Sequence, residues 1–200
     1  MVNICKKVIF LHFKLGIKGN FGGDCMKNEI KVVEYDWVKV FEREKKNILL
    51  ILGSHAVAIE HVGTTAILRE EAIPIIDILI GVVPFRGFSF YQSMFNLKDY
   101  SFTQTDMTDR YLFKKYESGI WTHNLHILPY NDEFYMRNEF LLRDYLREHP
   151  ELACEYVEIQ KRSIKKLSGN IAKHPRTKTG FIQKVIDAAR REKGLALQHM

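Results

Sequence analysis

One segment of the chain, residues 59–83 (IEHVGTTAILREEAIPIIDILIGVV), carries residue types that could do chemistry. Gly63, Thr64 and Thr65 follow a short apolar run, and such a turn can offer backbone N–H groups and hydroxyls to a phosphate. Asp77 interrupts the next apolar run, where an unpaired carboxylate is costly. A hard cation such as Mg²⁺, held by this carboxylate and by substrate phosphates, would explain it. The alternatives are an ordinary turn and an aspartate paired with a nearby Arg or Lys.

Two histidine-bearing segments could add to this site. Glu60 and His61 are consecutive in an extended segment, so their side chains point to opposite faces. His61 is then either a core histidine or a residue of a pocket. In THNLHIL (122–128), Asn124 and His126 share one strand face. His126 could bind a metal or a phosphate, although a lone strand histidine is more often structural.

Basic residues could supply an anion pocket. Arg110 and Lys114 are four residues apart in an expected strand, so they share a face. Two cations beside an aspartate suggest a phosphate site, and a solvated face explains them nearly as well. In LLRDYLRE (141–148), Arg143 and Asp144 flank an apolar stripe, and such charges usually serve solubility.

The elements that must position these residues follow from hydrophobic periodicity. Strands are expected at 56–62, 73–83, 100–105, 110–117 and 121–128. Helices are expected at 36–53, 88–97, 131–150, 151–169 and 178–194, with a helical turn in 63–72. This order predicts an α+β fold, with helices packed on one face of a mixed β-sheet and a C-terminal helical segment.

Composition describes an ordinary globular chain. It has 200 residues, of which 46% are hydrophobic and 27% charged, with a formal net charge of +6. Residues 1–25 contribute +3 of that charge, and the remaining +3 is too little to indicate nucleic-acid binding. The three cysteines form no CxxC motif, which indicates a reducing compartment and no zinc site. No stretch is apolar enough to span a membrane, so we expect a cytoplasmic protein.

The first 25 residues fit poorly with the rest. Gly22-Gly23-Asp24 can be encoded by a strong bacterial ribosome-binding sequence, and Met26 follows after one codon. We therefore expect residues 1–25 to be a translated, poorly packed leader, and residues 26–195 to form a single domain. Walker A, GxGxxG, GxSxG and HExxH motifs do not occur in the sequence.

Four motifs in this order resemble the GrpB family, also called UPF0157: IEHVGTTAI…IPIIDILIGV, THNLHIL, LLRDYLREHPELACEYVEIQKR and KTGFIQKVI. The resemblance runs from about Lys31 to Ala189. The family is grouped with the nucleotidyltransferase superfamily, which implies a mixed sheet with helices, a Gly-Ser turn and acidic metal ligands on neighbouring strands. Some bacteria carry a GrpB-like domain fused behind dephospho-CoA kinase, which implies a CoA-biosynthesis kinase as a partner.

The resemblance also implies roles for individual residues. The catalytic residues would be Asp77 and His126, and Asp77 and Glu60 would bind metal. Phosphate or nucleotide binding would fall to Gly63, Thr64, Thr65, Arg110, Lys114 and Arg143. Supporting residues would be His61, Asn124, Asp144 and Lys178. The implied cofactor is Mg²⁺, with a nucleoside triphosphate as substrate.

Three departures from the family pattern affect this interpretation. Leu79 stands where the superfamily has a second carboxylate, Ile73 replaces a basic residue, and His174 replaces a tyrosine. Active nucleotidyltransferases hold two Mg²⁺ ions with two or three carboxylates. One metal ion, or none with basic residues holding phosphate, suits this chain better.

Three functions follow. The first is a nucleotidyltransferase that acts on a small molecule with a Mg-nucleotide. The second is a catalytically inactive module that binds a nucleotide or phosphometabolite. The third is an interaction domain for a partner enzyme such as a CoA-pathway kinase.

Overall fold

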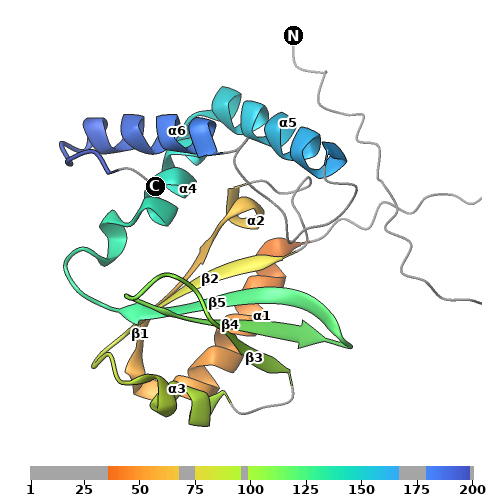
Figure 1. Cartoon of the computed structure of the whole chain (residues 1–200), viewed down its shortest axis with the longest axis vertical. Coiled ribbons are helices and arrows are strands. Elements are labelled where there is room, and N and C mark those ends of the chain that lie inside the picture. Colours follow the sequence, from red (N-terminus) through yellow and green to blue (C-terminus); the bar gives the residue numbers. More distant parts are fainter. Residues whose placement is uncertain (1–35, 68–74, 96–98, 167–178, 199–200) are drawn as a thin grey trace, which may run out of the picture. The chain divides into compact units, whose positions relative to one another are not determined.

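A mixed sheet of five strands lies at the centre of the fold (Figure 1) and carries six of the candidate residues: Glu60, His61, Asp77, Lys114, Asn124 and His126. The computed structural model describes residues 36–67, 75–95, 99–166 and 179–198. The strands are β1 (Ala56–Val62), β2 (Ile76–Val82), β3 (Tyr100–Thr103), β4 (Tyr111–Glu117) and β5 (Ile120–Pro129). Their order across the sheet is β1-β2-β5-β4-β3. β2 and β5 are parallel, and all other neighbouring strands are antiparallel. β5 therefore lies directly beside β2, the strand that carries Asp77, although it comes three strands later in the sequence.

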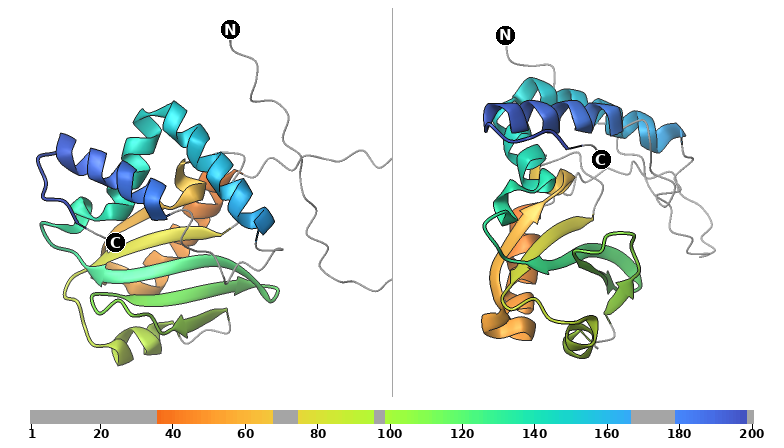
Figure 2. Two further views of the ribbon diagram at one scale, coloured as in Figure 1. Left: turned by 45° about the horizontal axis from the view of Figure 1, so that its top comes forward. Right: turned by 60° about the vertical axis from the view of Figure 1, so that its left-hand side comes forward.

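Six α-helices surround this sheet in the described part of the chain. They are α1 (Trp37–Leu52), α2 (Thr64–Ile67), α3 (Phe88–Met94), α4 (Asn138–Glu148), α5 (Pro150–Lys166) and α6 (Thr179–Glu192). Two short 3-10 helices, η1 (Gly53–His55) and η2 (Phe134–Met136), complete the set. In Figure 2 the helices α4, α5 and α6 lie together at one end of the sheet. The predicted α+β class, mixed sheet and C-terminal helical segment are confirmed.

The predicted helix at 131–150 is wrong at its start. α4 begins only at Asn138, because the backbone of Arg137 is extended (φ −70°, ψ 147°) and separates α4 from η2. This break lets both Phe134 and Phe140 reach the same apolar cluster, where their side chains are almost completely buried. The other starts and ends differ from the predictions by a few residues, as is usual at helix and strand ends.

Strand alternation divides the apolar residues between the two faces of the sheet. The larger cluster includes Ile78, Ile80 and Leu125 and packs on α1 and α3. Leu79 and Leu128 point the other way, into a smaller cluster with the phenylalanines of η2 and α4. α1 and α3 thus cover one face, and the start of α4 packs on part of the other (Figure 2).

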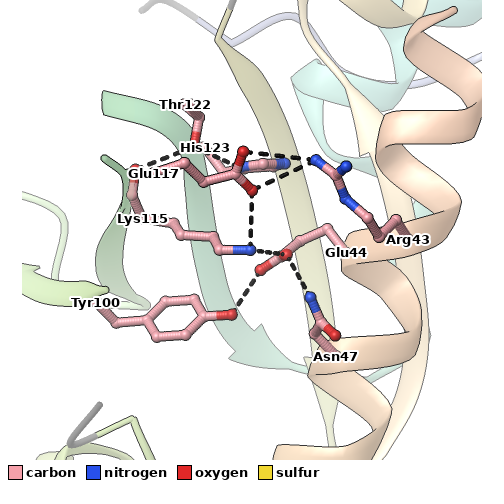
Figure 3. A network of polar contacts seen from close by, with 8 residues as sticks. All are labelled: Arg43, Glu44, Asn47, Tyr100, Lys115, Glu117, Thr122 and His123. Carbon is pink, nitrogen blue, oxygen red and sulfur yellow. Dashed lines mark hydrogen bonds and ion pairs between the residues drawn. The ribbon is translucent and has the colours of Figure 1, made fainter. Parts of the chain in front are cut away.

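A charged network is enclosed on the α1 face (Figure 3). The Glu44 carboxylate has no solvent exposure and accepts hydrogen bonds from Tyr100 Oη at 2.7 Å, Lys115 Nζ at 2.5 Å and Asn47 Nδ2 at 3.0 Å. Lys115 also lies 3.3 Å from Glu117. Buried charges are tolerated only when they are paired and hydrogen-bonded, so this network fixes how α1 meets β3 and β4.

Some predictions fall outside the described residues. These are the leader at 1–25, Ile73, His174 and Lys178. The domain limits of 26–195 stay a prediction. No described helix combines the length and apolarity that a bilayer crossing requires.

Candidate functional site

A row of polar side chains crosses three strands on the face opposite α1. Asp77 on β2 is the register partner of Asn124 on β5, which in turn is opposite Lys114 on β4. Asn124 Nδ2 donates to Asp77 Oδ1 at 2.7 Å, and Trp121 Nε1 donates to Asn124 Oδ1 at 3.1 Å. Lys114 Nζ lies 4.1 Å from the centroid of the Trp121 ring, a cation–π distance. We call Asp77, Asn124 and Lys114 the Asp77 row.

The Gly63 turn lies against one end of this row. Gly63 has a φ of +75°, and a Cβ built there would overlap the Asp77 carboxylate oxygen Oδ2. The Thr64 hydroxyl accepts a hydrogen bond from Gln160 Nε2 of α5 at 2.5 Å. Thr65 is buried, and its hydroxyl lies 2.8 Å from His61 Nε2. Both threonine hydroxyls therefore have protein partners.

His61 lies on the opposite face, in the core. Its ring stacks on Phe41 with centroids 5.0 Å apart, and it is 9% exposed. Burial lowers the pKa of His61 to about 4, and the positive charges of Arg147 and Arg143 add to this shift. The imidazole is therefore neutral at pH 7. Its position favours the core-histidine interpretation, with Thr65 as its hydrogen-bond partner.

Glu60 and His126 lie in the next row of the same face, with Leu79 between them. Glu60 accepts a hydrogen bond from Arg143 at 3.0 Å. Leu79, in the place of a second acid, is completely buried in an apolar cluster. His126 Nδ1 is buried and has no hydrogen-bond partner in the described part of the chain. Burial, and after it the charge of Arg110, lowers the pKa of His126 to about 4. His126 is thus a neutral imidazole diagonal to Asp77.

Arg110 belongs to an ion-pair network. Its guanidinium lies 2.5 Å from Glu139 of α4 and 3.3 Å from Asp109. Asp109 is also paired with Arg137 at 2.6 Å. Strand alternation would put Arg110 on the same face as Lys114. The positive charge of Arg110 is already compensated by Glu139 and Asp109. Lys114, in contrast, forms no ion pair with a described residue.

The charged residues of α4 connect that helix to the Gly63 turn. Arg143 donates to Glu60, to the His61 carbonyl at 3.0 Å and to Asp144 at 2.7 Å. Arg147 donates twice to the carbonyl of Ala66 at the end of α2, at 3.0 and 2.7 Å. These bonds engage most of the Arg143 donors. The geometry gives Arg143 and Asp144 a positioning role, and the implied phosphate contact of Arg143 stays a prediction.

Three residues of this face were missed at the sequence level. Tyr156 of α5 is 4% exposed and is hydrogen-bonded to Thr64 and Gln160, and its pKa is raised mainly by burial, with a contribution from the charge of Asp77. Gln160 is 2% exposed, and Trp121 supports Lys114. Tyr156 and Gln160 are four residues apart, so they share one face of a helix. This spacing is the sequence pattern from which the two residues could have been predicted to act together.

The donor set fits at most one Mg²⁺ ion. No group of three or more His, Cys, Asp or Glu side chains in the described part of the chain could hold a metal ion. Asp77 is the carboxylate that would hold a single ion together with ligand phosphates, because Glu60 is paired with Arg143. A two-metal arrangement needs a second acid, and Leu79 fills that place.

Comparison with known proteins agrees with the motifs. The model of a family described as GrpB protein matches residues 29–188. The UPF0157 protein YqkA of Bacillus subtilis is 30% identical over 160 residues, 78% of this chain and 44% of that protein, so the chain spans less than half of YqkA. The glutamate-rich protein GrpB of Alkalihalophilus pseudofirmus is 28% identical over 170 residues, 80% of this chain and 96% of that protein. The crystal structure of conserved protein GrpB from Enterococcus faecalis matches with a TM-score of 0.70 and 27% identity, over 79% of this chain and 94% of that one.

Proposed function

The chain belongs to the GrpB family, and from this premise we propose that it is a module that binds a nucleotide or a related phosphometabolite on the Asp77 row. One observation carries the proposal. A half-buried cation, Lys114, shares a face with a hydrogen-bonded carboxylate, Asp77, beside a glycine turn, and among the described residues no second acid lies in this row. Such a face can recognise a small polar ligand. Among the described residues, Asp77 has beside it no second carboxylate of the kind that two-metal nucleotidyl transfer uses.

The experiment is a thermal-shift screen with ATP, AMP, dephospho-CoA and 4′-phosphopantetheine, each with and without Mg²⁺. A ligand that binds only the folded state raises its stability by about 2.7 kcal/mol at a concentration of 100 Kd. We expect at least one phosphorylated compound to raise the Tm in the absence of Mg²⁺. If all of them leave the Tm unchanged, the binding function is refuted, and the CoA-pathway kinase partnership becomes the function to test.

Nucleotidyl transfer is the rival function, because Asp77 and His126 do share a face. It requires Mg²⁺-dependent release of pyrophosphate from a nucleoside triphosphate when an acceptor is present. Asp77→Asn would abolish that release. Turnover that depends on both Mg²⁺ and Asp77 would replace the binding function with the enzymatic one.

A further inference from the structure

We propose that the ligand lies across the strands with its phosphate at Lys114 and its sugar hydroxyls at Asp77. Of the phosphate-binding positions that the resemblance implies, Lys114 would then hold the phosphate and the Gly63 turn would not. The ligand class is then a sugar phosphate or a nucleoside monophosphate. This inference rests on the proposed function and specifies how the same face would be used.

The Gly63 end of the face is unsuited to a phosphate without a metal. The Asp77 carboxylate packs against Gly63, so a phosphate on this turn would meet a negative charge at close range. The hydroxyls of Thr64 and Thr65 are engaged by Gln160 and His61. The negative charge of Asp77 and the protein partners that both hydroxyls already have favour a neutral group here.

The groups at this end accept hydrogen bonds. The Asp77 carboxylate is an acceptor, and it already receives the Asn124 amide. Gln160 directs Nε2 to Thr64, and its carbonyl oxygen Oε1 is buried and accepts no hydrogen bond from the described residues. A buried acceptor without a partner costs about 1–3 kcal/mol. Sugar hydroxyls are neutral donors that suit such acceptors, whereas a phosphate at pH 7 offers chiefly acceptor oxygens.

The Lys114 end has the opposite character. Its ammonium carries three N–H donors, and the contact that orients it is the Trp121 ring at 4.1 Å. The next residue along the row is Ser101 of β3, which is exposed. An ammonium that forms no ion pair with any described residue, at the edge of a polar row, suits a phosphate without a metal.

The strand spacing sets the size of the ligand. Lys114 and Asp77 are separated by one strand, β5, so their backbones lie roughly 10 Å apart at about 4.8 Å per strand. Both side chains point to the same face, so a ligand on that face can reach both charged groups. A pentose phosphate or a nucleoside monophosphate has the phosphate-to-hydroxyl length that this span requires.

The test measures binding by isothermal titration calorimetry without Mg²⁺. The probes are AMP, adenosine, 2′,3′-dideoxy-AMP and ribose 5-phosphate. In the unaltered protein, AMP should bind about tenfold more tightly than adenosine, which lacks the phosphate, and than dideoxy-AMP, which lacks the hydroxyls. Lys114→Met should make AMP and adenosine bind equally. Asp77→Asn should instead bring AMP and dideoxy-AMP close together.

Lys46→Met is the matched control, because Lys46 is an exposed lysine of α1, which packs on the opposite face. It should leave every affinity unchanged. The inference is overturned if the advantage of AMP over adenosine survives Lys114→Met, or if neither AMP nor ribose 5-phosphate binds. In the second case the proposed function still stands when another phosphorylated compound raises the Tm, so the two failures are distinguishable.

Discussion

Removing Lys115 should destabilise the fold more than removing Lys114, the other lysine on the described strands. Glu44 has no solvent exposure, and the Lys115 ammonium at 2.5 Å is its cationic partner (Figure 3). In Lys115→Met the carboxylate keeps the hydrogen bonds of Tyr100 and Asn47 but loses the opposite charge. Methionine has nearly the same length as the lysine stem, so loss of packing contributes little.

The magnitude follows from the burial of this pair. Breaking a buried ion pair by removing one partner costs about 3–5 kcal/mol, because the remaining charge is uncompensated. The two retained hydrogen bonds to Glu44 favour the lower end of this range, about 3 kcal/mol. For a chain of this size, each kcal/mol corresponds to roughly 2–4 °C in Tm. The expected loss is therefore at least about 6 °C.

Urea denaturation followed by tryptophan fluorescence measures the effect as a fall in midpoint at constant slope. The double variant Glu44→Gln/Lys115→Met removes both charges, and it should recover much of the stability lost in the single variant. Lys114→Met is the control, since Lys114 is the neighbouring residue with its side chain on the other face. The reasoning is refuted if Lys115→Met costs less than about 1 kcal/mol, or if the double variant is no more stable than the single one.

Three further predictions concern the candidate site. Gly63→Ala should cost clearly more in urea denaturation than Gly119→Ala, because both glycines have φ near +75° but only the Cβ at 63 meets another side chain. Stability should fall as pH drops from 6.5 toward 4, because the lowered pKa of His61 means that the unfolded chain binds its proton first. His61 should contribute up to about 3 kcal/mol of this loss, and His126, whose pKa is also lowered to about 4, a similar amount, so His61→Gln should give a shallower pH profile. Arg147→Gln should lower the free energy of unfolding by about 1 kcal/mol, because the hydrogen bonds of Arg147 to α2 are lost, and Arg147→Lys should lower it less. Equal stability of the unaltered protein and both variants would contradict a role of Arg147 in holding α2.

Side-chain alternation was sufficient to predict which residues share a face. The period of two placed Asn124 and His126 together, and likewise Arg110 and Lys114, before any strand order was known. The strand register shows Asn124, His126 and Lys114 on the face of Asp77, and Arg110 directly precedes β4. Alternation could not predict that β5 lies between β2 and β4, because strand order depends on contacts between distant segments.

Charge compensation could not be predicted from local sequence. Glu44 lies in a helix rich in charged residues, and its partner Lys115 is 71 residues away. Arg143 likewise lies on a helix face that suggests solvent, yet it reaches β1 and bonds Glu60. In both cases the deciding partner comes from another element, and no local pattern identifies it.

Leu79 shows why the choice between binding and catalysis depends on packing as much as on one missing acid. It shares the face of Asp77 and is completely buried beneath Phe134 and Phe140. The break between η2 and α4 is what brings both rings to this position. An acid at residue 79 would lie in an apolar cluster, where an uncompensated charge costs several kcal/mol. The apolar packing of Leu79 therefore leaves Asp77 as the acid of β2, and this favours binding over two-metal transfer.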